Sequence, residues 1–440
     1  MEHEKAVDNK GLGVIRIKPL GIGGGGGESR SKCATSALKY TESSVIVDGK
    51  SFNYPKMVVD PDTNQESLFN EFMPNCIDGF LNGYNVNIIA YGQTGSGKTY
   101  TMFGPPGCMK KAAIGEYGRD VHEDYGLFPR GLIDIFNRLA ELKISDPCNS
   151  YVLTCSAVEL SVMGNEDMFI KSGTTKHANE RGRAFRSSSC GVVLDRSQKP
   201  PKLYGQNEIV IDKEEDLRRV FSAISVRNTS GTLMNDSSSR SHCIVALTIW
   251  KYDKISKKVR TSRFQFCDLA GSERLKDAHG NGVAYKKPNG GWNMDVLQGV
   301  ATNFSLMELS RCLQDIAMVR NAKGNFSFRA YLTDLLFLLS DSLVGNSLTA
   351  CFICVSQAER NKGESRNALD FGSRFARLSI NRKKMDEEYI SEMEYKASNS
   401  IQTNQKHLKT TRVDNHYASI REACIRDSEQ ILNVINILCN

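Results

Sequence analysis

The chain has 440 residues, of which 40% are hydrophobic and 24% are charged, with a formal net charge of +7 at pH 7. This composition is ordinary for a soluble globular protein. No run of about 18 apolar residues occurs and the first residues lack the apolar segment of a signal peptide, so we expect neither a membrane span nor secretion.

The first part of the chain contains a strand, a glycine-rich loop and a long helix. Residues 1–10 are polar, and we expect them to be flexible. Residues 13–20 are predicted to form a strand that Pro19 ends, and residues 21–30 a flexible loop. Residues 65–81 have apolar side chains at helical spacing before the stop signal Asn82-Gly83. Short strands are predicted between these elements, at residues 37–40, 45–47 and 51–54.

A phosphate-binding motif comes next. Residues 87–91 form an apolar run typical of a buried strand, residues 92–99 fit G-x-x-x-x-G-K-[ST], and a helix is predicted from Tyr100. Glycines let successive backbone N–H groups turn toward phosphate oxygens, while Lys98 would reach the terminal phosphates and the Thr99 hydroxyl would meet Mg²⁺. A coincidental glycine-rich turn is the alternative. The strand before the motif and the helix after it favour nucleotide binding.

Strands and helices continue to alternate along the chain. After a loop rich in glycine and charge at residues 104–125, helices are predicted at residues 132–142, 216–226, 296–316, 331–339 and 365–378. Strands are predicted at residues 150–160, 208–211, 241–252, 259–268 and 348–355. The two long strands are separated by a short segment that predicts a hairpin turn. No linker interrupts this pattern before residue 380, which favours one large α/β domain over two or three.

The thirteen cysteines are an odd number at scattered positions, which indicates reduced thiols in a cytosolic protein. Cys351 and Cys354 have C-x-x-C spacing, but they lie in a predicted strand and have no second ligand pair. We therefore interpret them as buried strand residues and not as metal ligands.

Composition changes at Arg382. Residues 383–414 are charged and polar, without a core pattern, whereas residues 417–438 recover helical spacing. This final helix could start a coiled coil or dock on the main domain, and the sequence leaves both alternatives open.

Two further segments are candidate sensors of the terminal phosphate. Residues 235–242, with sequence Asn-Asp-Ser-Ser-Ser-Arg-Ser-His, form a hydroxyl-rich loop before a strand. Residues 268–273, Asp-Leu-Ala-Gly-Ser-Glu, follow the next strand. A carboxylate at a strand end is suited to hold Mg²⁺ through water, and Gly271 can bring its N–H close to a phosphate. Each segment alone could be an ordinary turn, but together they point to a nucleotide-hydrolysing site.

With these three motifs the chain resembles a kinesin motor domain, over residues 11 to 381. The resemblance extends to shorter segments in the same order, at residues 16–19, 82–85, 341–346 and 368–376. It implies a P-loop NTPase with a central, mostly parallel mixed sheet and helices on both faces. Residues 382–440 would then be a neck linker or neck and a polar tail with a C-terminal helix.

The resemblance also implies roles for individual residues. Adenine would be bracketed by Arg16, Pro19 and Tyr100. The phosphates would be held by Gly92, Gln93, Thr94, Gly95, Ser96, Gly97, Lys98 and Thr99. Mg²⁺ would be bound by Thr99 and Ser239, with Asp268 acting through water. Hydrolysis of ATP to ADP would involve Asn235, Ser238, Gly271 and an ion pair of Arg240 with Glu273 that helps to relay a proton.

The implied partner is the microtubule, in the cytoplasm and cytoskeleton. A homodimer formed through sequence beyond the motor is open, and no nucleic acid is expected. Some positions depart from the family at the track surface: Phe304 replaces a lysine, and residues 330–333 lose another. Basic segments at 171–186 and 276–287 could compensate or could be solvated insertions.

Several functions are compatible with these departures. The resemblance favours a microtubule-stimulated ATPase that moves, with residues 379–383 placed like the start of a plus-end-directed motor's neck linker. The alternative is a non-motile microtubule-binding or crosslinking protein that uses nucleotide as a switch. The two sensor motifs argue against an unrelated nucleotide kinase. The short segment at residues 33–55 argues against a depolymerising kinesin.

Overall fold

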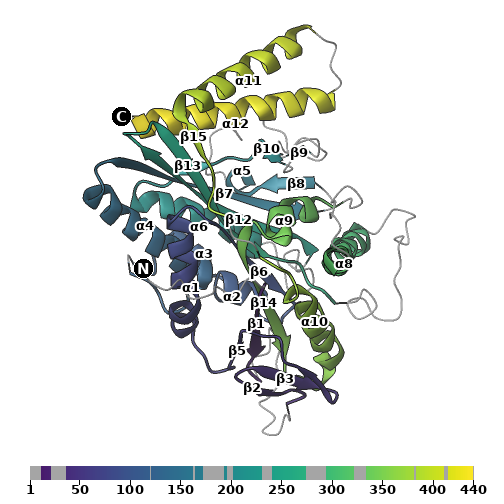
Figure 1. Cartoon of the computed structure of the whole chain (residues 1–440). Coiled ribbons are helices and arrows are strands. Elements are labelled where there is room, and N and C mark those ends of the chain that lie inside the picture. Colours follow the sequence, from purple (N-terminus) through teal and green to yellow (C-terminus); the bar gives the residue numbers. More distant parts are fainter. Residues whose placement is uncertain are drawn as a thin grey trace. The chain divides into compact units, whose positions relative to one another are not determined.

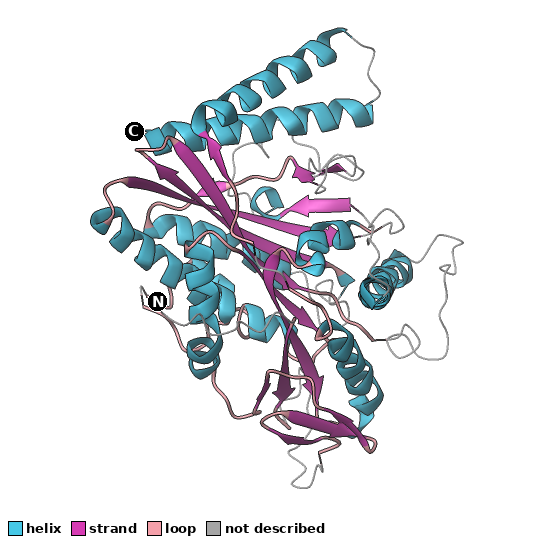
Figure 2. Ribbon diagram, in the orientation of Figure 1, coloured by secondary structure: helices cyan, strands magenta, loops and turns pink. Residues whose placement is uncertain are grey.

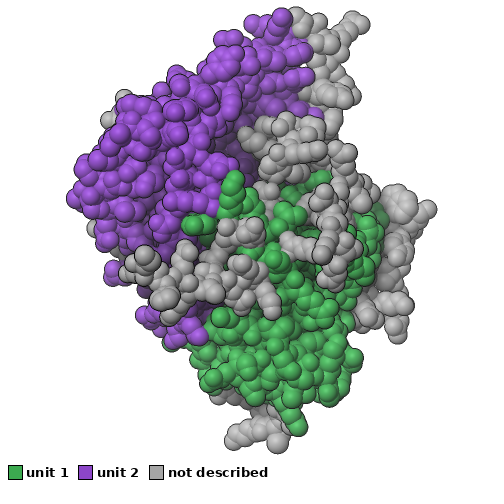
Figure 3. All heavy atoms as spheres, in the orientation of Figure 1, with its two compact units in different colours: residues 1–64, 84–98, 269–383 green, residues 65–83, 99–268, 384–440 purple. Residues whose placement is uncertain are grey.

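The computed structural model describes residues 11–20, 36–118, 120–161, 164–171, 193–195, 202–229, 240–273, 294–321, 333–380, 383–410 and 415–439, drawn in Figures 1 and 2. The chain divides into two compact units, coloured separately in Figure 3. Unit 1 comprises residues 1–64, 84–98 and 269–383. Unit 2 comprises residues 65–83, 99–268 and 384–440. Because the chain passes repeatedly from one unit to the other, no single linker separates them in the sequence.

The core of unit 1 is a parallel sheet. Its strands lie in the order β6 (Asn85–Tyr91), β14 (Ser347–Ser356), β1 (Leu12–Lys18) and β5 (Met57–Val59). Every residue of β14 is buried. Parallel strands that are covered on both faces read as continuous apolar runs, which is why β1, β6 and β14 could be predicted, whereas the three-residue β5 was not.

Helices and a small antiparallel sheet complete unit 1. Helix α10 (Lys362–Phe375) packs on β14 and β1, and it follows the short turn η4 (Glu359–Asn361). Helix α8 (Met294–Asn321) contacts α9 (Asp334–Val344) and α10. The small sheet consists of β2 (Lys39–Thr41), β3 (Ser44–Val47) and β4 (Lys50–Phe52).

Unit 2 contains an antiparallel sheet built on three long strands. β12 (His242–Asp253) pairs with β7 (Asn149–Ser161) on one side and β13 (Lys258–Asp268) on the other. The β12–β13 pair is the predicted hairpin. Shorter strands pair with the long ones, namely β8 (Gly164–Asp167), β11 (Ile209–Val210) and β15 (Glu387–Tyr389). A separate pair is formed by β9 (Val193–Asp195) and β10 (Lys202–Tyr204).

Helices cover both faces of the unit 2 sheet. Helix α1 (Gln65–Leu81) meets one face, where the ring centroids of Phe80 and Phe264 are 5.6 Å apart. On this face α4 (Leu127–Ser145) packs through Phe128, and α6 (Glu214–Thr229) packs against α4. Side chains alternate between faces along a strand, so Val259 points the opposite way, toward α12 (Asn415–Cys439). Among the described residues, the other helices are α2 (Lys98–Met102), α3 (Cys108–Ala113), α5 (Met168–Lys171) and α11 (Ile390–Thr410).

The structure differs from the sequence prediction in several segments, since β5, β8, β9, β10 and α5 were not predicted. Residues 104–125, predicted as a loop, contain the short helix α3, which buries Cys108, Met109 and Ala112. Residues 383–414, in which no core pattern was found, contain β15 and the 21-residue helix α11. The final helix is present as predicted. Of the two alternatives, a coiled coil or docking on the main domain, the structure shows docking, because the helix packs on β7 and β10 of unit 2.

No cysteine of the described residues forms a disulfide, and Cys351 and Cys354 are buried in β14 as expected. Cys148 and Cys439 are the exposed ones in this part of the chain. None of the helices seen here combines the length and apolar character needed to cross a membrane.

Candidate nucleotide site

The phosphate-loop motif in unit 1 has the backbone shape that its glycines allow. Gly92, Gly95 and Gly97 have φ angles of 147°, 76° and 106°, in the left-handed range that other residues rarely adopt. A Cβ added to Gly92 would lie 2.3 Å from the carbonyl oxygen of Cys354 in β14. Gly92 is therefore required both by its conformation and by its closeness to the neighbouring strand.

Polar side chains fix the shape of this loop. The buried Lys98 donates from Nζ to the carbonyl oxygens of Gly92 and Gln93, both at 2.9 Å. The Ser96 hydroxyl donates to the Gln93 oxygen at 2.8 Å, and Lys18 at the end of β1 donates to the Gly95 oxygen at 2.9 Å. Burial, followed by the nearby Arg360, lowers the pKa of Lys18. Lys98 and Lys18 thus place positive charge at the beginning and in the middle of the loop.

The second sensor motif also contacts the loop within unit 1. Glu273 accepts hydrogen bonds from the backbone N–H of Thr94 at 2.7 Å and from its hydroxyl at 2.5 Å. The Ser272 N–H donates to the Gly92 oxygen at 3.1 Å. A Cβ on Gly271 would lie 2.3 Å from both the Thr94 hydroxyl oxygen and a Glu273 carboxylate oxygen, so the absence of a side chain permits this contact. Thr94, Gly271 and Glu273 are thereby brought together.

The predicted metal ligands Thr99 and Asp268 meet in unit 2. Thr99 Oγ1 donates to Asp268 Oδ2 at 2.7 Å, at the end of β13. Arg227, in the last turn of α6, donates to the same oxygen at 2.6 Å, and the two charged side chains are 1% and 0% exposed. The guanidinium also donates to the Ser241 carbonyl oxygen at 2.9 Å. Asp268 is therefore held by a hydroxyl and a buried cation.

The charges around Arg227 keep it protonated. Burial opposes the positive charge, but the carboxylate of Asp268 and the nearby Cys243 and Glu159 outweigh burial, and the pKa of Arg227 is raised. Glu159 in β7 in turn accepts a hydrogen bond from the Ser241 hydroxyl. A buried charge of this kind is tolerated because it is paired and hydrogen-bonded.

The other predicted site residues fall into three groups. Arg16 is buried in β1 and Pro19 follows that strand, both in unit 1, whereas Tyr100 lies in α2 and is 42% exposed. Arg240 is half-buried beside the start of β12. Outside the described residues lie Asn235, Ser238 and Ser239. The adenine contacts and the Arg240–Glu273 ion pair remain predictions.

Sequence reasoning missed Arg227 and Glu159. An arginine in the last turn of a helix is normally explained by the helix dipole, and Glu159 stands in an apolar strand. Glu159 could have been noticed because a carboxylate inside a buried strand needs a partner. The signal for Arg227 is weaker, since only the fold brings it to Asp268.

The residues present fit a magnesium–nucleotide. Among the described residues, Asp268 Oδ1 is a buried oxygen with no hydrogen-bond partner, while Oδ2 is fully engaged. A carboxylate oxygen of this kind suits a hard cation or its water, and Thr99 supplies a hydroxyl oxygen beside it. In unit 1 the glycine-rich loop and Lys98 suit phosphate groups.

Comparison with known proteins identifies relatives. The model of the kinesin motor domain family matches residues 27–378. Human kinesin-like protein KIF15 is 30% identical over 382 residues, which cover 85% of this chain and 25% of that protein. Kinesin-related protein 5 of Dictyostelium discoideum is 30% identical over 354 residues, covering 80% of this chain and 32% of that protein. The chain thus spans between a quarter and a third of the length of these curated relatives.

Solved structures show the same fold. The KIF14 dimer, determined with AMP-PNP in complex with a microtubule, superposes with a TM-score of 0.66 and 25% identity, over 86% of this chain and 96% of that one. A fast kinesin superposes with a TM-score of 0.65 and 22% identity, over 86% and 94%. The fold is therefore that of a P-loop NTPase with a mixed central sheet and helices.

Proposed function

Because this chain belongs to the kinesin motor-domain family, we propose that it is an ATP-hydrolysing microtubule motor. The observation that carries the proposal is the contact between Thr99, the last residue of the phosphate-loop motif, and Asp268, the first residue of the second sensor motif. Two motifs that are 169 residues apart meet through a hydrogen bond, as a nucleotide-hydrolysing site requires.

Metal binding is the first part of the proposal. Thr99 and Ser239 would bind Mg²⁺ directly, and the free oxygen of Asp268 would hold it through water. When bound, the ion would neutralise charge that develops on the phosphates. Lys98 would move from the carbonyl oxygens of Gly92 and Gln93 to phosphate oxygens.

Hydrolysis would depend on residues that position water and stabilise charge. The Gly271 N–H and the side chains of Asn235 and Ser238 would face the terminal phosphate and the attacking water. Glu273 now accepts hydrogen bonds from Thr94, and it would exchange this partner for Arg240 to help relay the proton. Positioning and charge stabilisation supply most of the rate in such reactions.

The proposed partner is the microtubule, which places the protein on the cytoskeleton in the cytoplasm. The microtubule complex of the KIF14 relative supports this partner. A homodimer through sequence beyond the motor is part of the proposal, as is plus-end-directed movement.

A second candidate function is a non-motile, nucleotide-switched microtubule-binding protein. Phe304 favours it, because this side chain is 42% exposed on α8 at a position where the family has a lysine. An apolar side chain there removes one attraction to an acidic track.

Steady-state ATP turnover with and without microtubules tests both functions. A motor is expected to show strong stimulation that Glu273→Ala abolishes, whereas Glu141→Ala, an exposed position on α4, leaves it unchanged. Nucleotide-dependent microtubule binding without stimulation would replace the motor by the switch. Absence of nucleotide binding would overturn both, and gliding direction on marked microtubules tests polarity.

A further inference from the structure

The segment that follows the family-matched residues is paired with the edge of the unit 2 sheet. We call residues 384–389 the strap. The Met385 N–H donates to the Gly83 oxygen at 2.9 Å, β15 pairs antiparallel with Lys258–Arg260 of β13, and the Ile390 N–H donates to the Lys257 oxygen at 3.0 Å. The strap is thus hydrogen-bonded at both ends, although the family match ends at residue 378.

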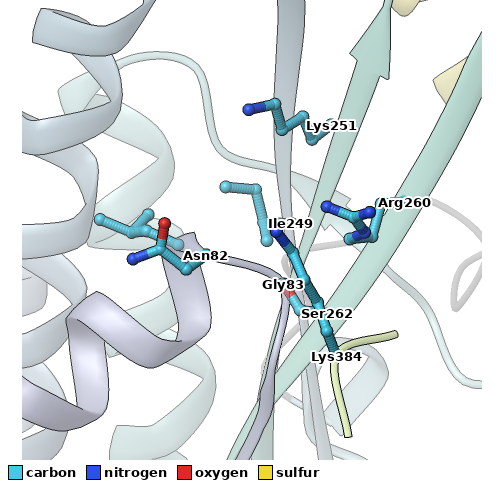
Figure 4. Close-up of a pocket in the computed structure, with 8 residues that line it drawn as sticks. Asn82, Gly83, Ile249, Lys251, Arg260, Ser262 and Lys384 are labelled. Carbon is cyan, nitrogen blue, oxygen red and sulfur yellow. The ribbon is translucent and has the colours of Figure 1, made fainter. Parts of the chain in front are cut away.

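Arg260 is the main side-chain contact of the strap. Its Nε donates to the Met385 oxygen at 3.0 Å, and its guanidinium forms an ion pair with Glu387. Figure 4 shows Arg260 and Lys384 close to Gly83 in the small pocket that all three residues line. Gly83, with φ of 92°, leaves room for both, because a Cβ there would lie 2.5 Å from Arg260 Cδ.

The strap itself buries little apolar surface. Glu387 and Tyr389 of β15 are exposed, and Tyr389 is 47% exposed. Short edge pairings with few buried apolar contacts open at low free-energy cost. A second element is therefore needed to keep the strap in place.

Helix α12 provides an apolar contact next to the strap. Its residues Val434 and Leu438 are buried against Trp250, Tyr252, Val259 and Val152 of the sheet. Ile390, the residue that follows the strap, and Met393 pack against the same cluster. The end of the strap and the end of α12 thus share one hydrophobic cluster, and Val259 pairs with Glu388 of the strap in the sheet.

Polar contacts fix α12 at a second place. Asp427 accepts a hydrogen bond from the Gly205 N–H at 2.8 Å, and Gln430 accepts one from the Glu208 N–H at 2.5 Å. Gln430 also donates to the Gln206 oxygen at 3.1 Å. Two side chains one turn apart therefore bind backbone groups just before β11, on the side of the sheet away from β13, and these contacts give α12 a defined position on the sheet.

We propose that α12 is an intramolecular latch for the strap. While Val434 and Leu438 are packed against the strands of the sheet, Met385 stays bonded to Gly83 and β15 stays paired with β13, so the strap cannot move away from the sheet. Release of α12 exposes the cluster around Ile390 and lets the strap open. This conformational device is distinct from nucleotide hydrolysis and is tested without nucleotide.

Amide hydrogen exchange of the full chain, followed by mass spectrometry, tests the latch. In Val434→Asp/Leu438→Asp, the amides of Met385 and Ile390 are expected to exchange at least tenfold faster than in the unmodified chain. Ile437→Asp is the matched control, because Ile437 is 42% exposed on the same helix, and it should leave them unchanged. Amides of β14 in unit 1 report whether the fold is intact.

A milder variant covers the case in which the double substitution unfolds unit 2. Asp427→Ala/Gln430→Ala removes hydrogen bonds from α12 but no core side chain, and it should accelerate the same two amides to a smaller extent. If α12 amides lose protection in either folded variant while Met385 and Ile390 keep theirs, the strap holds by itself and the latch is refuted.

Discussion

At the residue scale, the pair of Arg227 and Asp268 is the most consequential arrangement in unit 2. Both side chains are almost completely buried. One carboxylate oxygen of Asp268 accepts hydrogen bonds from Arg227 and from the Thr99 hydroxyl. Burying two charges costs several kcal/mol per ion, and the attraction between the paired charges regains about the same free energy. The pair therefore constrains the position of Asp268 more than it stabilises the fold.

Removing one partner of this pair should be far more damaging than removing both. Arg227→Met leaves Asp268 buried without its cation and is expected to lower the free energy of unfolding by about 3–5 kcal/mol. Arg227→Met/Asp268→Asn should recover much of that loss, because no uncompensated charge remains. Urea unfolding of Arg227→Met, Asp268→Asn and the double variant measures the coupling free energy between the two side chains. Additive losses would show that the two side chains do not act as a pair.

At the element scale, helix packing explains where sequence prediction succeeded. The bounds of α1 were predicted because its apolar side chains recur at helical spacing and Asn82-Gly83 follows directly. The long strands β7, β12 and β13 were predicted from their apolar runs. These are patterns that short-range chemistry imposes whatever the surroundings.

The same scale shows why α11 was missed. Its buried positions include Ala397 and Asn404, which are small or polar. Asn404 accepts a hydrogen bond from Arg421 of α12, and Ser400 accepts one from Ser428, so the two helices meet partly through polar contacts. A helix whose buried face is hydrogen-bonded lacks the apolar periodicity on which sequence prediction depends.

The approach of α10 to its neighbours gives a stability prediction. A Cβ on Gly372 would lie 2.1 Å from the buried hydroxyl oxygen of Tyr54, so Gly372→Ala should lower the free energy of unfolding by about 1–3 kcal/mol. Gly79→Ala in α1 is the control, since nothing lies within 4 Å of its added Cβ. That variant should be neutral or gain up to about 1 kcal/mol from helix propensity. The denaturant midpoints of both variants are compared with that of the unmodified chain. Equal changes in the two midpoints would contradict the packing argument.

Helix α8 gives a prediction about the track. Phe304→Lys adds a cation at an exposed position, so microtubule affinity should rise at low salt and fall more steeply as salt increases. Ile144→Lys, 85% exposed at the end of α4, is the charge-matched control. Cosedimentation over a range of salt concentrations measures both. An equal response of the two variants would mean that total charge matters and position 304 does not.

At the scale of the whole molecule, nucleotide binding should raise the free energy of unfolding. With Mg²⁺ and ADP at about 100 times the dissociation constant, the free energy of unfolding should rise by about 2.7 kcal/mol. Chelation of Mg²⁺ with EDTA should remove most of this gain, and Asp268→Asn should reduce the part that EDTA removes. Thermal unfolding under these conditions is the measurement.

Chelation without nucleotide is the control for this experiment. If Mg²⁺ stabilises the protein only together with nucleotide, EDTA alone should not change the unfolding temperature. No cluster of three or more His, Cys, Asp or Glu side chains suited to a metal occurs among the described residues. A drop caused by EDTA alone would indicate a structural metal elsewhere in the chain.

The interleaving of the two units explains what the sequence could not show at this scale. The boundaries between them fall at Gly83–Tyr84, Lys98–Thr99, Asp268–Leu269 and Lys383–Lys384. Two of these boundaries lie inside nucleotide motifs, where composition does not change. Sequence reasoning finds domains through linkers, so boundaries of this kind leave no signal in the sequence.

The distribution of thiols makes the latch observable by fluorescence. Cys148 precedes β7 and Cys439 ends α12, and both are exposed, whereas most other described cysteines are buried. Replacing Cys33 and Cys190, which lie outside the described residues, would favour attachment of a donor dye and an acceptor dye at Cys148 and Cys439. Energy transfer between the two dyes would then report, in single molecules, how often α12 dissociates from the sheet.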